Sequence, residues 1–534
     1  MQNEKASPER ARRVEAGSPE RAKRVEGVIA AVAVLLALAV YLLRLDLVVG
    51  QYVDDAWYVV LAQAVASGQG YHLISAPTLD LGAILPFSPP GFPLVLALVV
   101  AVTPVFPANV LALKAVSILA MVSVGVLSAM YYRDRSLPTP FAIALAFVVV
   151  ITPAFVFLAT STVMSEPLFT LAEVAAIVLV SRQRPVLGGL AAAAAVLVRS
   201  AGLPILAAAT VWYLTQRDRR SAYLFLGSAV VALLPWMIYA RVYATPIEVR
   251  LAHGGAHVFT YAEQFWMRRA GEIQSGQIGL HELPARVGTA LVDIFARDTG
   301  AIVMPELYRS PIESGEETLS VGGRRSDLTQ GSMGNTAGTM VVSALVSALA
   351  LVGVLTRWQR GAGAGDWFVP LALLPVILFP HWAYRLVLPL TPFLYGYLVD
   401  GVQVLTNAWA RVLRISLVCL IILHLADHAM YLAHIDDAVW LADAREAAEV
   451  TDWMRRELTE PGAVASTNPA LIFLRTGRRG VALDDAHGRW AAWRAQGIRY
   501  VVDLNESELP DPSLGYRVRF TTARSKLWVI EITD

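Results

Sequence analysis

The sequence predicts a polytopic α-helical membrane protein that ends in a small α/β domain. Of its 534 residues, 56% are hydrophobic and only 16% are charged, well below the roughly 25% of soluble domains. The Leu, Val and Ala residues come in long blocks, as they do in membrane-spanning helices. After about residue 433 the blocks give way to alternating helical and β-rich stretches such as "DAREAAEVTDWMRREL" and "RYVVDL", which is the pattern of a small α/β fold.

The composition also excludes several classes of protein and site. The net charge is +1, so no overall field favours nucleic acid as a partner. Cys419 is the only cysteine, which excludes disulfides within the chain and cysteine-based zinc sites. The first apolar run follows a basic segment but ends in "YLLRLD" without a small-residue cleavage pattern. We therefore expect an uncleaved anchor.

The apolar blocks divide the chain into three regions. Residues 1–26 form a polar, basic arm, residues 27–432 a transmembrane domain, and residues 433–534 the α/β domain. We predict eleven spans in the middle region, from the lengths and spacing of its apolar runs. They are 27–43, 110–131, 139–158, 167–181, 186–200, 202–215, 221–243, 338–356, 367–380, 386–405 and 415–432.

The basic residues predict the orientation of these spans. One side carries the N-terminal arm and the short loops "YRDRS", "SRQRP", "QRDRR", "RWQR" and "ARVLR", which is the positive-inside pattern. The N-terminus is therefore expected in the cytoplasm. The loops 44–109 and 244–337 and the C-terminal domain are then expected on the outer face. The run "PPGFPLVLALVVAVTPVFP" would break this alternation as a span, so it predicts a re-entrant or interfacial helix.

Two adjacent carboxylates open the first outer loop. In "VDDAWYVVLAQAVASGQG", Trp57, Leu61 and Ala64 recur at helical spacing, so Asp54 or Asp55 would be the N-cap of an interfacial helix. The positive end of that helix favours the ionised carboxylate. Capping alone explains this pair equally well, and a functional interpretation needs further charged groups on the same face.

Such groups occur at the outer ends of other spans. Glu166 opens a span in "STVMSEPLFTL", and five basic or polar residues lie at outer helix ends: Lys114, Arg199, His381, Tyr384 and Arg385. A lone acid at a helix start or a lone cation at a helix end is usually structural. Six such sites on one face indicate instead a site that binds an anionic phosphate beside a carboxylate base.

The chain resembles the GT-C fold glycosyltransferases, polytopic enzymes that use lipid-phosphate-linked sugars. The sub-group that it resembles is the protein mannosyltransferase and aminoarabinose transferase type. Over about residues 27–405 the matching motifs are "DDAWYVVLAQAVASGQGY", "PFSPPGFPLVLAL", "STVMSEPLFTL", "LVRSAGLPIL" and "YRLVLPLTPFLYG". The resemblance implies a polyprenyl-phosphate-linked donor.

The resemblance also implies roles for individual residues. The first acid of the family's pair is the proposed catalytic base, which matches Asp54. Asp55 stands where the family usually has Glu, and Glu166 matches the acid of the next outer loop. The family's basic residue before Pro-Pro is replaced by Ser88.

Recognition of the donor phosphate is therefore assigned to other cations. The assigned residues are Arg385 and Lys114, with His381, Tyr384 and Arg199 nearby in the predicted topology. Arginine and lysine side chains stabilise negative charge that develops on a phosphate.

These residues predict transfer of a sugar to a lipid, glycan or protein acceptor by a single, inverting displacement, with one general base. The predicted partners are the polyprenyl-phosphate donor, the acceptor and membrane lipids. No cofactor is predicted: no glycine-rich nucleotide loop is present, and although three acids could hold a divalent metal, their spacing shows no ligand motif. The alternatives are a secondary transporter and an envelope polymer ligase.

In the C-terminal domain, "STNPALIFLRTGRRGVALDD" places Asp484, Asp485 and His487 near a predicted strand end. These residues could bind a sugar, but an ordinary α/β turn is the favoured interpretation because no complete motif is present. We expect the domain to position the acceptor or to stabilise the outer face.

Overall fold

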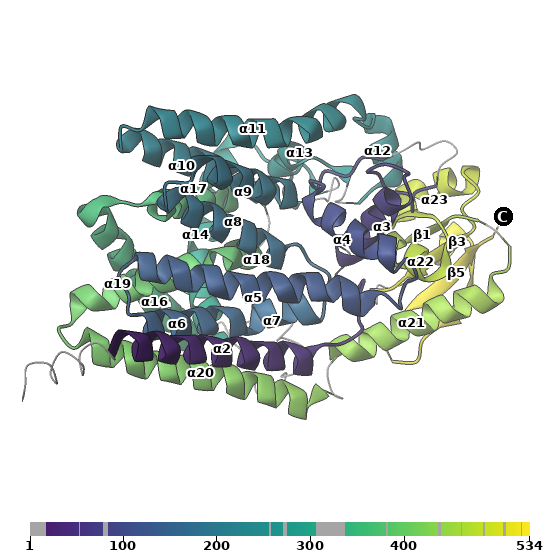
Figure 1. The fold of residues 1–534 in the computed structure, drawn as a ribbon. Helices are drawn as coiled ribbons and strands as arrows, with labels where there is room; N and C mark the ends of the chain where they lie inside the picture. The colour runs from purple at the N-terminus through teal and green to yellow at the C-terminus, as the bar shows by residue number, and fades with distance from the viewer. Residues whose placement is uncertain are drawn as a thin grey trace, which may run out of the picture.

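The fold consists of a long helix bundle and a C-terminal α/β domain packed at one end of it (Figure 1). The computed structural model describes residues 18–52, 54–77, 84–255, 258–270, 275–305, 337–380, 383–435, 439–460, 462–483, 486–505, 509–524 and 526–533. Most helices of the bundle run roughly along one direction, and α2 and α20 lie side by side at its lower edge in Figure 1.

Five described helices are long and apolar enough to cross a membrane. They are α2 (Ser18–Arg44, of which Lys23–Arg44 qualifies), α5 (Val110–Asp134), α11 (Arg219–Val242), α16 (Ala337–Gly361) and α20 (Trp409–Ala433). Residues 18–26 of the predicted arm thus form the first turns of α2. The predicted span 139–158 is two helices, α6 (Thr139–Ile151) and α7 (Pro153–Thr160), bent by 55°. The bend falls at Pro153, whose ring cannot continue the preceding hydrogen-bond ladder.

The remaining predicted spans are shorter helices. They are α8 (Glu166–Ser181), α9 (Pro185–Val198), α10 (Leu203–Thr215), α17 (Ala364–Leu378) and α19 (Thr391–Leu405). At a rise of about 1.5 Å per residue, the 16 residues of α8 extend about 24 Å, less than the roughly 30 Å of a hydrocarbon core. A helix occupies each predicted position, but the count of eleven spans stays a prediction.

Short helices close the end of the bundle that faces the C-terminal domain. The segment predicted as the first outer loop forms α3 (Asp54–Ala66) and α4 (Gly91–Val102), which pack together with the rings of Tyr58 and Phe92 edge to face at 5.1 Å. The other short elements of the bundle are η1 (Ser200–Gly202), α12 (Ile247–His253), α13 (Tyr261–Trp266), η4 (Leu280–Glu282), α14 (Leu283–Asp293), η5 (Ile294–Asp298), α15 (Thr299–Val303), α18 (Ala383–Val387) and η7 (Leu388–Leu390). With 12 residues, α4 is too short to cross a bilayer, in agreement with the predicted interfacial helix.

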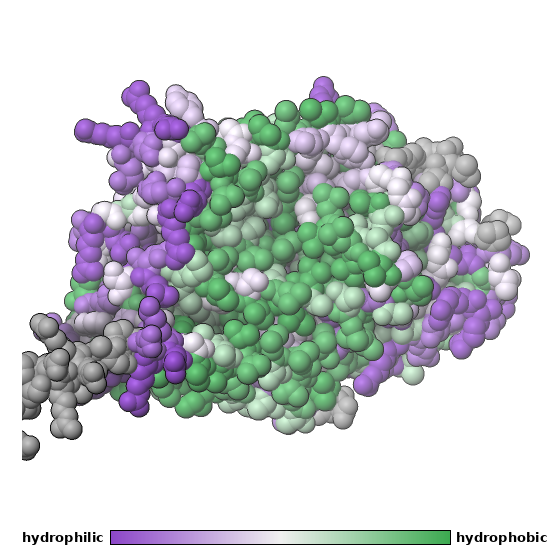
Figure 2. All heavy atoms as spheres, in the orientation of Figure 1, coloured by the Kyte–Doolittle hydropathy of each residue, from purple (hydrophilic) through white to green (hydrophobic). Residues whose placement is uncertain are grey.

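The surface of the bundle carries a continuous apolar band. Figure 2 shows hydrophobic side chains across the middle of the molecule, with hydrophilic side chains at both ends. Leu98, Val102 and Val231 are examples of large apolar side chains that are mostly exposed. An apolar surface of this extent would be unstable in water, so the band identifies the part of the molecule that faces lipid.

The C-terminal domain contains one mixed sheet with strand order β2-β1-β3-β5-β4. Strand β1 (Val464–Ser466) pairs in parallel with β2 (Gly480–Ala482) and β3 (Tyr500–Asp503), whereas β5 (Trp528–Ile532) pairs antiparallel with β3 and β4 (Tyr516–Thr521). Helices α21 (Val439–Glu457), α22 (Pro469–Thr476) and α23 (Ala486–Ala495) and the short η9 (Pro512–Leu514) complete it. The predicted α/β domain is therefore confirmed. Asp484 and Asp485 lie outside the described residues, as does the side chain of His487.

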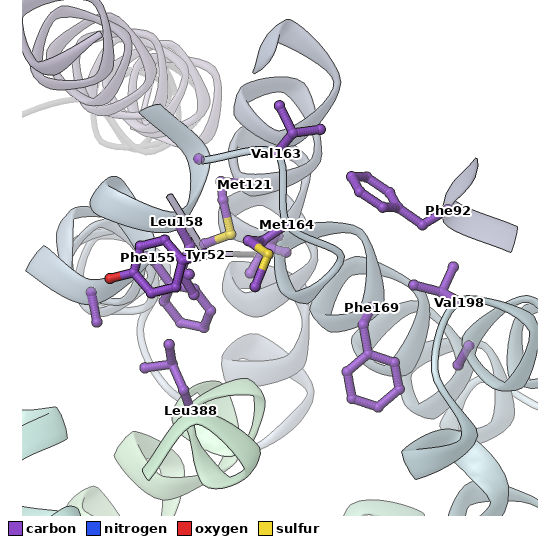
Figure 3. Close-up of a cluster of buried hydrophobic side chains, with 14 of the residues drawn as sticks. Tyr52, Phe92, Met121, Phe155, Leu158, Val163, Met164, Phe169, Val198 and Leu388 are labelled. Atoms are coloured by element: carbon purple, nitrogen blue, oxygen red, sulfur yellow. The ribbon is translucent and has the colours of Figure 1, made fainter. Parts of the chain in front are cut away.

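The largest buried cluster extends to the end of the bundle where the short helices gather. Figure 3 shows Tyr52, Met121, Leu158 and Met164 gathered in this cluster, with Leu388 approaching from a different part of the chain. This packing fixes the loop before α3 against α5 and α7, and so determines where α3 begins.

Candidate functional site

A cavity of about 910 Å³ opens among the short helices. Its walls come from α3, residues 86–88, the junction of α9 with α10, α13, and the adjoining ends of α17 and α18. Most lining side chains are apolar or aromatic, among them Trp57, Phe87, Leu203, Phe265, Leu371 and Phe379. The charged lining residues are Asp54, Arg199 and Arg385, so the charge is confined to one small part of a largely apolar wall.

Four charged side chains form one connected group, the cavity cluster of Asp54, Glu166, Arg199 and Arg385. Arg385 contacts Asp54, with Nη2 2.9 Å from Oδ2, and also donates to Glu166 through Nε. Arg199 Nη1 lies 2.8 Å from Glu166 Oε1. Glu166 is fully buried, whereas the Asp54 side chain is 32% exposed. One buried carboxylate thus holds two guanidinium groups, and one accessible carboxylate faces the cavity.

The local sequence explains why these side chains meet. Glu166 is the first residue of α8 and Pro167 follows it, a position where proline is tolerated. The preceding Ser165 accepts a hydrogen bond from Arg199 Nη1 at 3.0 Å, and its hydroxyl lies 3.1 Å from the hydroxyl of Tyr58. Arg199 sits in extended conformation where α9 ends. The start of one helix and the end of the next thereby face α3.

Asp54 and Asp55 lie in different environments although they are neighbours. Successive helical residues are about 100° apart around the axis, so only one of the two can face the cavity. Asp55 is fully buried, and its Oδ2 accepts from the N–H of Gly50 at 2.7 Å and its Oδ1 from the N–H of Ala56 at 3.0 Å. Burial raises the pKa of Asp55 to about 6, although the Gly50 N–H and Lys114 oppose this. Asp55 supports the loop and does not line the cavity.

Lys114 also lies outside the cavity lining. Its ammonium is fully buried and lies 2.8 Å from each of three oxygens: Asp46 Oδ1, the Asp46 carbonyl and the Thr160 carbonyl. These contacts tie the end of α2 to α5 and α7 and use all three donors of the ammonium. Asp46 was not singled out in the sequence, although an acid directly after an apolar span in "YLLRLD" was a signal that a cation must lie nearby.

Two other residues predicted to bind the phosphate are His381 and Tyr384. His381 lies outside the described residues. Tyr384 is buried and is not among the residues that line the cavity. Of the predicted cations, Arg199 and Arg385 therefore face the cavity.

Several lining residues were not predicted individually. Tyr261 lies in α13, within the second predicted outer loop, and its ring packs against Phe87 at 4.7 Å and Phe379 at 5.8 Å. Only its aromatic character, in a stretch "FTYAEQFW" that is otherwise unremarkable, could have indicated it. Among the residues that the structure describes, no three His, Cys, Asp or Glu side chains lie close enough together to hold a metal ion.

The arrangement combines three chemical capabilities. The two guanidinium groups can bind an anion such as a phosphate through charge-assisted hydrogen bonds. The accessible carboxylate of Asp54 can accept a proton within hydrogen-bond reach. The apolar wall can hold a hydrocarbon chain. A soluble anionic substrate would need only the first of these.

No family model matches the sequence, and no curated protein matches it. The apo oligosaccharyltransferase of Archaeoglobus fulgidus aligns over 89% of this chain and 69% of its own length, with 12% identity and a TM-score of 0.52. Apo ArnT from Cupriavidus metallidurans aligns over 94% of this chain and 97% of its own length, with 14% identity and a TM-score of 0.48. The structure of ArnT bound to undecaprenyl phosphate aligns over 94% of this chain and 98% of its own length, with 15% identity and a TM-score of 0.47.

At such low identity, the match to the oligosaccharyltransferase bears on the fold alone. It extends over most of this chain, and the apolar helices agree with it. The predicted GT-C fold is therefore confirmed, and the chain is a polytopic membrane protein that shares its fold with an oligosaccharyltransferase.

Proposed function

We propose that the protein is a membrane glycosyltransferase that moves a sugar from a polyprenyl phosphate to an acceptor at the outer face of the cytoplasmic membrane. One observation carries the proposal. Arg385 joins the accessible Asp54 to the buried Glu166 at the edge of an apolar cavity. A lipid-linked phosphate requires this combination of cations and apolar wall, and an acceptor requires the nearby base. The fold is also that of an oligosaccharyltransferase.

The donor phosphate would bind at Arg199 and Arg385. Both guanidinium groups are already oriented by Glu166, and Arg199 additionally by Ser165, so little reorganisation is needed when negative charge develops on the leaving phosphate. Glu166 is fully buried and is therefore a positioning residue in this proposal. The prenyl chain would lie along the apolar wall that α10 and α17 contribute through Leu203, Ala207 and Val376.

Asp54 would act as the general base. The acceptor oxygen loses its proton to the Asp54 carboxylate and attacks the anomeric carbon. The bond from that carbon to the phosphate oxygen breaks, and the polyprenyl phosphate departs with the electron pair. One displacement inverts the anomeric centre, and a phosphate leaving group stabilised by arginines needs no general acid.

The orientation follows from the charge distribution. The basic residues of the short loops, such as Arg133, Arg182 and Arg217, lie at or just after the C-terminal ends of α5, α8 and α10. The N-terminal ends of α8 and α10 lie at the cavity instead, because Glu166 pairs with Arg199 and Arg385 of the cavity wall and Leu203 is part of that wall. By the positive-inside rule, the N-terminus lies in the cytoplasm and the cavity and C-terminal domain face outwards.

The test is turnover of radiolabelled polyprenyl-phosphate sugars by membranes that contain the protein. Wild type should form a covalent product, and Asp54→Asn should lower turnover by about 10²–10⁴-fold because the base is lost. Asp134→Asn is the matched control, since Asp134 lies in an exposed ion pair with Arg182 far from the cavity. Sealed vesicles that accumulate label without covalent product would overturn the proposal in favour of transport.

A further inference from the structure

We infer that Asn468 of the C-terminal domain is a positioning residue for the transfer reaction, because it holds the loop that sets the start of α3. The inference rests on the proposed function, and it gives the C-terminal domain a part in the catalytic site. The contact joins residues 418 positions apart in the sequence.

The side-chain amide of Asn468 has two roles. Its Oδ1 accepts from the N–H of Leu471 at 3.0 Å, which caps the N-terminus of α22. Its Nδ2 donates to the carbonyl oxygen of Gly50 at 2.5 Å. The side chain is 4% exposed, so water does not compete for either bond. Capping alone would need only the oxygen, and the second bond crosses from one domain to the other.

Gly50 connects Asn468 to α3. Its φ of +99° lies in the region that favours glycine, and a Cβ at this position would lie 2.6 Å from Cδ1 of Leu471 in α22. Its N–H donates to Asp55 Oδ2 at 2.7 Å. Asn468 thus fixes one side of Gly50 and Asp55 the other. Asp55 shares the first turn of α3 with Asp54, the proposed base.

Other contacts of the C-terminal domain surround the same helix. The N–H of Gly480 in β2 donates to the carbonyl of Ser75, which follows α3, at 2.8 Å. Arg489 in α23 donates to the carbonyl of Leu251 in α12 at 2.7 Å. Near the end of α12, the ring of His253 lies 5.9 Å from that of Trp57 in α3. The domain therefore contacts the chain before, after and beside α3.

This arrangement predicts a specific kinetic signature. Loosening Gly50 would shift the first turn of α3 and move Asp54 relative to the acceptor oxygen, and a displacement of about 1 Å can cost roughly 10²-fold in rate. The ion pair of Arg199 with Glu166 and the apolar wall do not depend on Gly50. Binding of the lipid-linked donor should therefore change little.

The test uses Asn468→Ser in the full-length protein, in membranes given radiolabelled polyprenyl-phosphate sugars. Serine caps a helix about as well as asparagine but is too short to reach Gly50 as well. We expect kcat to fall by roughly 10²-fold and KM for the donor to stay within about twofold.

The matched control is Asp511→Ser, which replaces the cap of η9 and should alter neither constant. Equal kcat values for the two variants would overturn the inference. Absence of turnover in wild type would overturn the proposed function instead.

Hydrogen exchange gives a readout that does not depend on turnover. In purified protein, a peptide that contains Gly50 and Ala56 should exchange faster in Asn468→Ser than in wild type or Asp511→Ser, while a peptide from α5 exchanges equally in all three. Unchanged exchange at Gly50 and Ala56 would overturn the inference whatever the activity.

A double variant gives a third test. Combining Asn468→Ser with Asp55→Ala should change kcat by less than the sum of the two single effects in free energy, because both act through Gly50. Full additivity would contradict the inference.

Discussion

Two buried arginine–carboxylate groups lie at opposite ends of α17 and differ in one respect. Beyond the C-terminal end of α17 lies the cavity cluster. At the N-terminal end, Arg135 pairs with Asp366 at 3.2 Å and with Asp400. These three side chains are called the closed cluster, and the partly exposed Arg357 lies 3.6 Å from Asp366 at its edge. All three side chains of the closed cluster are at least 93% buried. In the cavity cluster, by contrast, the Asp54 side chain is about one-third exposed.

The surroundings of the two clusters explain this difference. Arg135 is flanked by the rings of Tyr131 and Tyr397, whose centroids lie 5.2 and 5.1 Å away, and none of the closed cluster lines the cavity. Paired buried charges often serve only to join helices. An arginine–carboxylate group therefore indicates a chemical site only where a cavity leaves part of it open to a substrate.

The largest effect is expected when an acid of each cluster is replaced by its amide. Glu166→Gln leaves Arg199 and Arg385 without their shared buried carboxylate, which should cost about 3–5 kcal/mol of folding free energy and abolish transfer. Asp400→Asn should cost less, because Arg135 keeps Asp366, and activity per folded molecule should persist. Denaturation of purified protein together with turnover per mole measures both. Equal loss of specific activity in the two variants would show that the comparison is wrong.

The arginines give the second test. Arg385→Lys removes the planar guanidinium that contacts Asp54 and Glu166 at once, and kcat/KM should fall by about 10²–10³-fold, as for loss of one preorganised donor. Arg135→Lys makes the same change in the closed cluster. Its kcat/KM should stay within about threefold of wild type. A large loss in Arg135→Lys would mean that the closed cluster contributes to the chemistry.

Asp55 provides a pH-dependent test on the buried side of α3. Because burial raises its pKa to about 6, wild type loses stability as pH rises from about 4 through 6, where the unfolded chain gives up this proton first. Asp55→Asn carries no proton to lose. Its stability relative to wild type should therefore rise over this window, by up to about 3 kcal/mol. The measurement is denaturation of both proteins at pH 4.5 and at pH 8, which bracket the raised pKa. A stability difference between Asp55→Asn and wild type that does not change with pH would contradict this prediction.

The smallest effect is expected at the surface. Arg182 and Asp134 form a two-bond ion pair with both side chains more than one-third exposed. Asp134→Asn should lower stability by less than about 1 kcal/mol and leave turnover unchanged. Thermal denaturation at low and high salt checks this, since any contribution should shrink as salt screens the pair.

The sequence predicted the helices well because hydropathy and helix ends are local properties. Each predicted span coincides with a helix, and the acids at Asp54 and Glu166 begin α3 and α8. The division of 139–158 into two helices was missed, although Pro153 inside the run was a signal for it. The bounds of α8 and α17 agree with the predicted spans 167–181 and 367–380 to within a few residues, because an apolar run marks where a helix begins and ends.

The sequence was less informative about which charges meet. Arg199, Arg385 and Lys114 were equivalent as basic residues near helix ends, yet two face the cavity and Lys114 is held by Asp46. Likewise nothing near Gly50 in the sequence points to Asn468. Partners so far apart in the chain are selected by packing, which depends on all the helices together.

The amino-acid sequence alone determined that this chain enters a membrane repeatedly, places Asp54, Glu166 and Arg199 at the ends of helices, and ends in an α/β domain, because apolar runs, helix-starting acids and strand alternation act over a few residues. Only the tertiary structure decided that Asp54 faces the cavity while Asp55 turns inward, and that Glu166 holds two arginines. The physical reason is that the burial of a charge and its choice of partner depend on atoms brought together from distant segments, whose arrangement is set by the packing of the whole fold.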